Sequence, residues 1–191
     1  MALINVAARE IHCKIVYYGP GMCGKTTNLQ FIHSQIPQTT KTDLLSIATE
    51  TERTLFFDFL PLDLGKVRGF QTRFHLYTVP GQVLYERTRV AVLNGADGVV
   101  FVADSKRKSL EENVNSLKEL SRNIQKMGKR FQDYPIVLQY NKRDVPDALP
   151  VPLMDKYLNP LMWQRFEAVA TSGPGVFDTL RAISKLVISK L

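Results

Sequence analysis

Apolar residues recur at two different periods along the chain, and the changes of period divide it into strands and helices. The run Ile11–Tyr18 is rich in β-branched and aromatic residues and ends at Gly19, which predicts a buried strand. Beyond it, Leu29, Ile32 and Ile36 recur at helical spacing. The chain therefore opens with a strand, a glycine-containing turn and a helix.

A polar segment, Pro37 to Asp43, follows this helix and is expected to be a loop. Two strand-like runs come next, Thr54–Leu60 and Gln71–Val79. The segment between them, Pro61–Gly69, holds one proline and two glycines, so we predict that the two runs pair as an antiparallel hairpin.

The rest of the chain continues the alternation of strands and helices. We expect, in order, a loop with a short helix (Pro80–Asn94), a buried strand (Asp97–Asp104), a long helix, a strand (Pro135–Tyr140), a helix (Ala148–Tyr157), a short strand (Phe166–Ala170) and a closing helix (Val176–Leu191). Ser109 and Glu112 form a capping-box pattern for the long helix. Its expected apolar stripe is Leu110, Val114, Leu117, Leu120 and Ile124, and that of the closing helix is Phe177, Leu180, Ile183 and Val187.

This order predicts an α/β fold, with a mostly parallel central sheet flanked by helices. An additional N-terminal strand over Leu3–Ala7 is an option. We find no repeat or linker, so we expect a single domain over 1–191.

Composition adds little to the expected class of protein and function. The 191 residues are 45% hydrophobic and 23% charged, which is ordinary for a globular protein, and no apolar run is long enough to span a bilayer. The net charge of +7 comes from scattered Lys and Arg, with short clusters at 106–108 and 126–130. Solvated helix rims and an acidic partner or lipid surface both fit these clusters. Cys13 and Cys23 have no metal-like or disulfide-framework spacing and are expected to be reduced thiols.

The segment between the first strand and the first helix fits G-x-x-x-x-G-K-[ST], the P-loop. Glycines let backbone N–H groups turn around phosphate oxygens, and the helix directs its positive end to the same place. Lys25 is expected to contact β- and γ-phosphates, and the Thr26 hydroxyl to bind Mg²⁺. The predicted phosphate-binding residues are Gly19, Pro20, Gly21, Met22, Cys23, Gly24, Lys25, Thr26 and Thr27.

A second motif, Asn141-Lys142-Arg143-Asp144, directly follows an apolar strand. In open α/β sheets, ligands bind at the carboxyl ends of the strands. A carboxylate such as Asp144 can accept two hydrogen bonds from a base with an N1–H and an exocyclic amine, which describes guanine and not adenine. Asn141 is expected to tie this loop to the P-loop, and the Lys142 stem to lie over the base.

A third motif, Thr78-Val79-Pro80-Gly81-Gln82, ends the second strand of the hairpin. Gly81 can offer its backbone N–H to a γ-phosphate, and Gln82 can orient an attacking water. None of the three histidines is assigned as a catalytic base.

Together these motifs make the chain resemble a Ras-superfamily GTPase, a small G domain of the P-loop NTPase class. Val169-Ala170-Thr171, followed by Gly173, resembles the second guanine loop of such proteins. The resemblance implies that the Ala170 backbone N–H meets the base oxygen.

Three longer runs resemble the MglA family of bacterial GTPases, which act in gliding motility and cell polarity. They are Lys14 to Gly21, Thr49 to Pro61 and Phe74 to Gln82. This resemblance implies that Thr54 binds Mg²⁺ and γ-phosphate. It also implies that Arg53 acts as an arginine finger supplied in cis.

One position departs from the Ras pattern. Most such GTPases carry Asp where this chain has Thr78, and the MglA family carries Thr. We hypothesise that Asp58 takes over part of the metal-binding role. An equally weighted alternative is that Asp58 bonds only to neighbouring backbone or to an arginine.

The resemblance implies a GTP/GDP switch that hydrolyses GTP with Mg²⁺, slowly without an activating partner. The implied partners are an MglB-like, homodimeric roadblock-fold GTPase-activating protein, an exchange factor and polarity or motility effectors. We expect a cytoplasmic monomer without a transmembrane or lipid anchor, open to recruitment to a cell pole. The C-terminal Ser-Lys-Leu matches a peroxisomal address, which we interpret as chance.

Three other functions remain open at this point. A GTP-dependent binding module with negligible hydrolysis need not keep Gln82 and Arg53. A P-loop kinase or ATPase is disfavoured by Asn141 to Asp144. Nucleic-acid binding rests on net charge alone, so no nucleic-acid partner is expected.

Overall fold

The computed structural model describes residues 2–37, 45–48, 54–67, 69–81 and 85–191, with the backbone alone for 45–48, 54–59, 64 and 67. The strands are β1 (Leu3–Asn5), β2 (Glu10–Tyr18), β3 (Leu45–Ala48), β4 (Thr54–Val67), β5 (Phe70–Thr78), β6 (Gly98–Asp104), β7 (Ile136–Asn141) and β8 (Arg165–Glu167). The helices are α1 (Lys25–Gln35), α2 (Glu86–Leu93), α3 (Leu110–Lys126), α4 (Val151–Leu158) and α5 (Val176–Ile188), with 3₁₀ turns η3 (Arg107–Ser109) and η4 (Phe131–Asp133).

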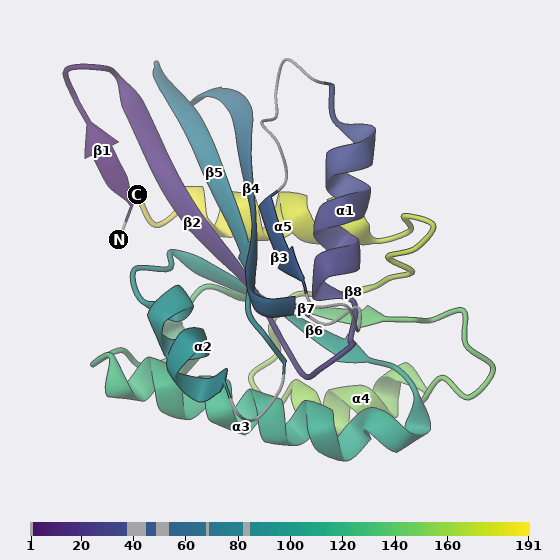
Figure 1. The fold of residues 1–191 in the computed structure, drawn as a ribbon. Helices are drawn as coiled ribbons and strands as arrows, with labels where there is room; N and C mark the ends of the chain where they lie inside the picture. Colours follow the sequence, from purple (N-terminus) through teal and green to yellow (C-terminus); the bar gives the residue numbers. More distant parts are fainter. Residues whose placement is uncertain (1, 38–44, 49–53, 68, 82–84) are drawn as a thin grey trace.

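The strands form one sheet in the order β3-β4-β5-β2-β6-β7-β8 (Figure 1). The joins from β5 through β2, β6 and β7 to β8 are parallel, and β3 and β4 extend the sheet antiparallel. The predicted α/β class with a mostly parallel sheet is thus confirmed. It follows from the alternation of strands and crossover helices, which requires parallel neighbours.

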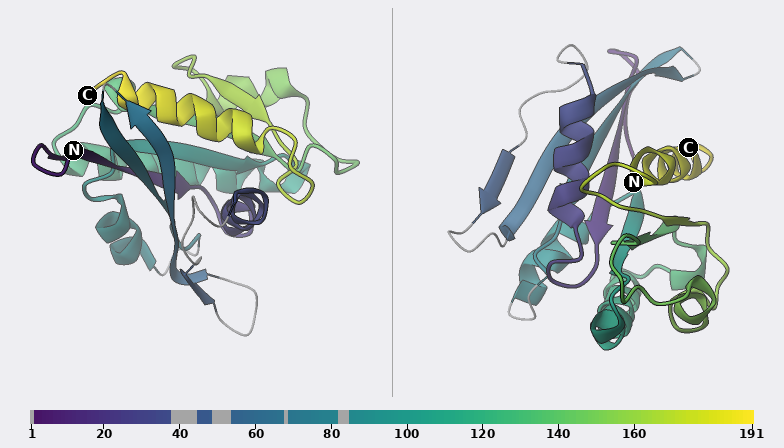
Figure 2. Two further views of the ribbon diagram at one scale, coloured as in Figure 1. Left: turned by 90° about the horizontal axis from the view of Figure 1, so that it is seen from above. Right: turned by 90° about the vertical axis from the view of Figure 1, so that its right-hand side faces the viewer.

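Two cores separate the helices into layers on the two faces of the sheet. Ile15 and Tyr17 of β2 point into the core that α1 and α5 cover, whereas Val16 and Tyr18 point into the core under α2, α3 and α4. Figure 1 shows α2, α3 and α4 gathered below the sheet, and the left view of Figure 2 shows α5 lying over the strands. The alternation along β2 therefore assigns each neighbouring side chain to a different layer.

The predicted hairpin is present, but its first strand is longer than expected. β4 runs on to Val67, so most of the segment predicted to connect the two strands belongs to the strand. Leu62 continues the buried alternation and faces Phe74, and the register shifts between Asp63 and Lys66. Gly65, with φ 87°, lies at that irregularity, so this glycine marks a bulge and not a turn.

The N-terminal strand is present as β1, which pairs antiparallel with the first half of β2. The sequence pattern missed β3, a strand of four residues. The loop predicted over Pro37 to Asp43 lies, apart from Pro37, outside the described residues. α1 ends at Gln35, and Ile36 is extended because a residue before proline disfavours the helical conformation.

The predicted capping box is wrong. Ser109 makes no side-chain cap hydrogen bond and has helical dihedral angles, because the chain enters α3 through the 3₁₀ turn η3. The apolar stripe of α3 is confirmed at Leu117, Leu120 and Ile124, which are buried.

Three other boundaries differ from the prediction by three residues. α4 begins only at Val151, because Ala148 forms a β-bridge with Lys106. β8 ends at Glu167, and a turn begins at Ala170. α5 ends at Ile188 and not at Leu191.

Candidate functional site

The predicted motifs meet at the carboxyl ends of the parallel strands. The P-loop follows β2, Val79 to Gly81 follow β5, and Asn141 to Asp144 end β7 and continue beyond it. A cavity of about 780 Å³ lies over the P-loop, beside Val79 and Gly81, and reaches Arg89 and the side of α3. Lys142, Asp144 and Ala170 do not line this cavity, so it covers the phosphate side of the predicted site and not the base side.

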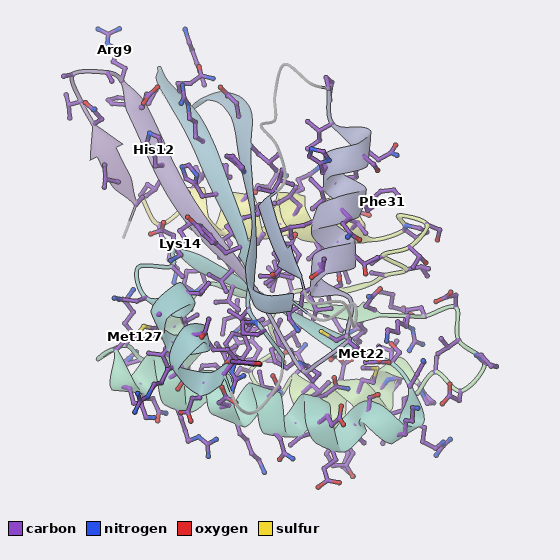
Figure 3. All side chains as sticks on the ribbon, viewed as in Figure 1. Arg9, His12, Lys14, Met22, Phe31 and Met127 are labelled. Carbon is purple, nitrogen blue, oxygen red and sulfur yellow. The ribbon has the colours of Figure 1, made fainter. Side chains whose placement is uncertain are left out.

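The P-loop has the backbone that its glycines allow. Gly24 takes a left-handed conformation with φ 103° directly before α1, and Met22 is exposed on the loop (Figure 3). Lys25 is buried, and its Nζ donates to the carbonyl oxygens of Gly19 at 2.9 Å and Pro20 at 2.6 Å. The loop therefore wraps around its own lysine and fixes the position of the cation.

Gly81 packs directly on the P-loop. A Cβ atom at Gly81 would lie 2.3 Å from the Gly21 backbone nitrogen and 2.6 Å from the Pro20 carbonyl carbon. No residue other than glycine fits so close to another backbone. The loop after β5 is thus in contact with the predicted phosphate cradle.

Asn141 makes the tie that the sequence predicts. Its Nδ2 donates to the Cys23 carbonyl oxygen at 2.8 Å, across 118 residues of chain. Its Oδ1 accepts a hydrogen bond from the Ala170 N–H at 2.9 Å. One buried amide therefore joins the P-loop, β7 and the loop after β8. In this structure the Ala170 N–H is bonded to Asn141, and its contact with a base remains a prediction.

The two charged side chains of the same motif differ in their surroundings. Lys142 has a left-handed backbone, with φ 63°, and its Nζ lies 2.6 Å from Oδ2 of the buried Asp104. Asp144 is exposed, and no described residue donates a hydrogen bond to its carboxylate. The Lys142 side chain is thus held in place, and the Asp144 carboxylate is open to a ligand.

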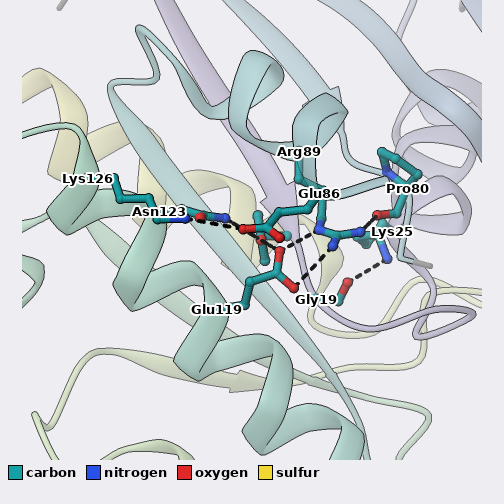
Figure 4. Close-up of polar contacts among 9 residues, drawn as sticks. Gly19, Lys25, Pro80, Glu86, Arg89, Glu119, Asn123 and Lys126 are labelled. Carbon is teal, nitrogen blue, oxygen red and sulfur yellow. Dashed lines mark hydrogen bonds and ion pairs between the residues drawn. The ribbon is translucent and has the colours of Figure 1, made fainter. Parts of the chain in front are cut away.

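Figure 4 shows an arginine–glutamate pair that the sequence motifs did not predict. Both residues line the edge of the cavity. Arg89 is 3% exposed; its Nε lies 2.6 Å from Glu119 Oε1 and its Nη2 lies 3.2 Å from Oε2. Its Nη1 donates to the Pro80 carbonyl oxygen at 3.2 Å. α2 and α3 thus hold the residue just before Gly81. The spacing of Arg89 with buried Val92 and Leu93 is the signal that could have revealed it.

Burial also changes the acid–base behaviour of groups around the site. It raises the pKa of the Cys23 thiol, although the nearby Lys25 cation acts in the opposite direction. Burial, together with the Glu119 carboxylate that accepts from its hydroxyl at 2.7 Å, raises the pKa of Tyr18. Both groups therefore stay neutral near pH 7 and add no charge beside the P-loop.

Four predicted site residues lie outside the described side chains. Arg53 and Gln82 lie outside the described residues, and the structure describes only the backbone of Thr54 and Asp58 in β4. Phe59 faces Tyr77 across the antiparallel pair, so Asp58 lies at the register position next to buried Thr78. Thr26 and Thr27 are half-buried in the first turn of α1.

Within the described ranges, the structure has no helix that is both long and apolar enough to cross a membrane.

The comparisons with known proteins agree with the motifs. No family model matches the chain. The chain is 56% identical, over all of its 191 residues and 98% of the relative's length, to the Mutual gliding-motility protein MglA of Myxococcus xanthus strain DK1622. Such similarity over the whole length confirms the predicted family: the chain belongs to the MglA family of small Ras-like GTPases.

Proposed function

We propose that this protein binds GTP and GDP at the carboxyl edge of the sheet, hydrolyses GTP to GDP and phosphate, and does so slowly without a partner. The observation that carries the proposal is the Asn141 side chain, which bonds the guanine-type motif to the P-loop. A nucleotide site needs such a contact, because the P-loop must hold the phosphates and the loop after β7 must hold the base of the same ligand.

Four features of the described residues fit a nucleotide. The cavity over the P-loop has room for phosphates, the Lys25 cation lies buried beside it, and the Asp144 carboxylate is exposed on the base side. Gly24 admits no side chain, because a Cβ there would lie 2.2 Å from Asn141 Nδ2. These features support phosphates on the P-loop and guanine near Asp144, Lys142 and Ala170.

Phosphoryl transfer to water depends mostly on positioning and charge stabilisation. In our proposal the P-loop amides and Lys25 hold the phosphates, Gly81 contacts the γ-phosphate, and Gln82 places the water. Arg53 neutralises the charge that develops in the transition state. These roles follow from the motifs and from membership of the MglA family.

Mg²⁺, when bound, would neutralise part of the negative charge of the phosphates. Thr26, Thr54 and Asp58 are the residues we propose to hold it. Thr78 has no charge to offer, and the register that places Asp58 next to Thr78 supports the hypothesis that Asp58 compensates. The competing assignment, in which Asp58 bonds only within the protein, predicts unchanged Mg²⁺ dependence for Asp58→Ala.

We propose that GTP orders the segments around Thr54 and Gly81 and that hydrolysis releases them. The proteins that bind the ordered or released conformation would be an MglB-like activator, an exchange factor and effectors of gliding motility or polarity. The name of the Myxococcus relative supports a motility role. Recruitment to a cell pole belongs to the same proposal.

The test is single-turnover hydrolysis of GTP by the purified full chain with Mg²⁺, beside an ATP control and an assay of bound nucleotide. Slow GTP turnover without ATP turnover supports the proposal. Bound GTP without turnover favours a GTP-dependent binding module, and turnover of ATP at the same rate contradicts the assignment of Asn141 to Asp144.

A further inference from the structure

A second group of polar side chains lies deeper in the protein than the predicted site. Gln139 on β7, Asn28 on α1 and Thr179 on α5 are fully buried. Gln139 and Asn28 exchange two hydrogen bonds through their amides, at 2.8 and 2.9 Å. Gln139 Nε2 also donates to Thr179 Oγ1 at 3.0 Å.

This amide network extends to the backbone of two loops. Asn28 Nδ2 donates to the carbonyl oxygen of Gly24, the last P-loop glycine, at 2.8 Å. The Thr179 hydroxyl donates to the carbonyl oxygen of Gly175, where the loop after β8 enters α5, at 2.7 Å. Every side-chain N–H and O–H of the three residues is thus donated to an acceptor.

The network forms a second layer beneath Asn141. Gln139 and Asn141 are two residues apart on β7, so their side chains leave the same face of the sheet. Asn141 joins the P-loop to the loop after β8 at the carboxyl end of β7, through Cys23 and Ala170. Gln139 joins the same two loops one layer lower, through the helices that carry them.

Apolar packing also joins α1 to the loop after β8, but it restrains their distance less than the amide network does. A Cβ at Gly173 would lie 2.1 Å from the Phe31 ring, so this glycine lies against α1 (Phe31 is labelled in Figure 3). The Phe31 ring also meets Phe177 edge-on, with centroids 6.2 Å apart. Apolar contacts of this kind tolerate small shifts, whereas the amide network has only one arrangement that satisfies all of its donors.

We propose that Gln139 is a positioning residue for the base. Through Asn28 and Thr179 it sets the distance between the P-loop and the loop after β8, and hence the position of Asn141 and Ala170 toward guanine. This inference rests on the proposed nucleotide site. An apolar residue would fill the same space at lower desolvation cost, so the buried amide is explained by the geometry that it imposes.

The test is the release rate of a fluorescent GDP (mant-GDP) from the full chain, with thermal unfolding of the same samples. Gln139→Met keeps the length of the side chain and removes its hydrogen bonds. It should release GDP about three- to tenfold faster, the effect of losing a net hydrogen bond or two from the positioning of the base. Hydrolysis of GTP already bound should keep its rate constant, because no phosphate contact is changed.

Two further variants separate positioning from stability. Asn28→Leu combined with Gln139→Met replaces both amides by apolar groups, which restores stability and leaves release fast. Tyr134→Phe is the matched control: it removes another buried hydrogen bond, of 2.6 Å to the Ala96 carbonyl, at the opposite end of β7. It should lower the melting temperature and leave GDP release unchanged.

Each result supports or overturns the inference. Fast release from the stable double variant, with normal release from Tyr134→Phe, supports it. Release within about twofold of the parent in both Gln139 variants overturns it, and so does faster release from Tyr134→Phe in proportion to its loss of stability. A parent protein that binds no guanine nucleotide overturns the proposed function itself, and the inference with it.

Discussion

The base side and the phosphate side of the proposed nucleotide site are held together in different ways. On the base side, buried amides on β7 bond to α1, α5 and the loops beside them, in the two layers of Asn141 and Gln139. On the phosphate side, Gly81 rests on Gly21 through backbone packing, and Arg89 holds the Pro80 carbonyl oxygen through one hydrogen bond.

This difference fits a switch. The amide ties join elements with only one fully bonded arrangement, which suits recognition of a base that is the same in GTP and GDP. The contact between Gly81 and Gly21 of the P-loop is backbone packing alone, without a hydrogen bond from a side chain. We propose that this contact opens when a γ-phosphate binds, which is the part of the ligand that changes.

The largest effect is expected from the charge that we propose Arg53 supplies. Arg53→Ala should slow single-turnover GTP hydrolysis by between about 10³- and 10⁵-fold, the range of an arginine finger, and leave GDP affinity nearly unchanged. Gln82→Ala should also slow turnover and keep binding. If both variants hydrolyse GTP at the parental rate, the phosphate side is wrongly assigned.

Asp144→Asn should shift the base preference of the site from guanine toward xanthine. The amide offers a donor where guanine also offers a donor, whereas xanthine offers an acceptor. We expect the ratio of GDP to XDP affinity to fall about a thousandfold, as for a site built to bond one pattern of donors and acceptors. Competition against mant-GDP measures it, and retained guanine selectivity would contradict the role of Asp144.

Lys25→Ala removes the cation from the phosphate cradle. Affinity for GDP should fall by about a hundredfold, because hydrogen bonds between charged groups are lost in a buried place. The measurement is equilibrium titration with mant-GDP, and Lys185→Ala on the outer face of α5 is the control for loss of one positive charge. Equal affinities in both variants would contradict the phosphate role.

Arg89→Met should have the smallest effect on nucleotide affinity. It frees the Pro80 carbonyl oxygen, so GTP affinity relative to GDP should fall about fivefold, the effect of one net hydrogen bond. It also leaves the half-buried Glu119 carboxylate without its cation, which destabilises the fold. Adding Glu119→Gln should recover the stability and not the GTP preference; recovery of both would mean that Arg89 acts on stability alone.

The sequence predicts the fold well where periodicity and burial agree. The alternation Ile15, Val16, Tyr17, Tyr18 indicates a strand between two helix layers, and Leu117, Leu120 and Ile124 mark the buried side of α3. It fails where local chemistry has two structural outcomes. Gly65 fits a turn or a bulge, and Ser109 fits a helix cap or a 3₁₀ turn.

The site divides in the same way. The P-loop is predictable because its backbone geometry requires glycines at fixed spacing, and Asn141 because its motif directly follows an apolar strand. Asn28 and Arg89 escaped prediction because other polar residues flank them in the sequence, and Gln139 because it is a single polar residue within an apolar strand. Such a residue signals a buried partner, but the partner lies on another element and only the packed structure identifies it.

The most direct test of the account is the affinity of the full chain for GDP against ADP, titrated with Mg²⁺ present. The account predicts that GDP binds at least about 10³-fold more tightly, because ADP leaves the base-side donors and acceptors unpaired. Equal affinities for GDP and ADP would contradict it, since the ties through Asn141 and Gln139 would then position loops that read no guanine.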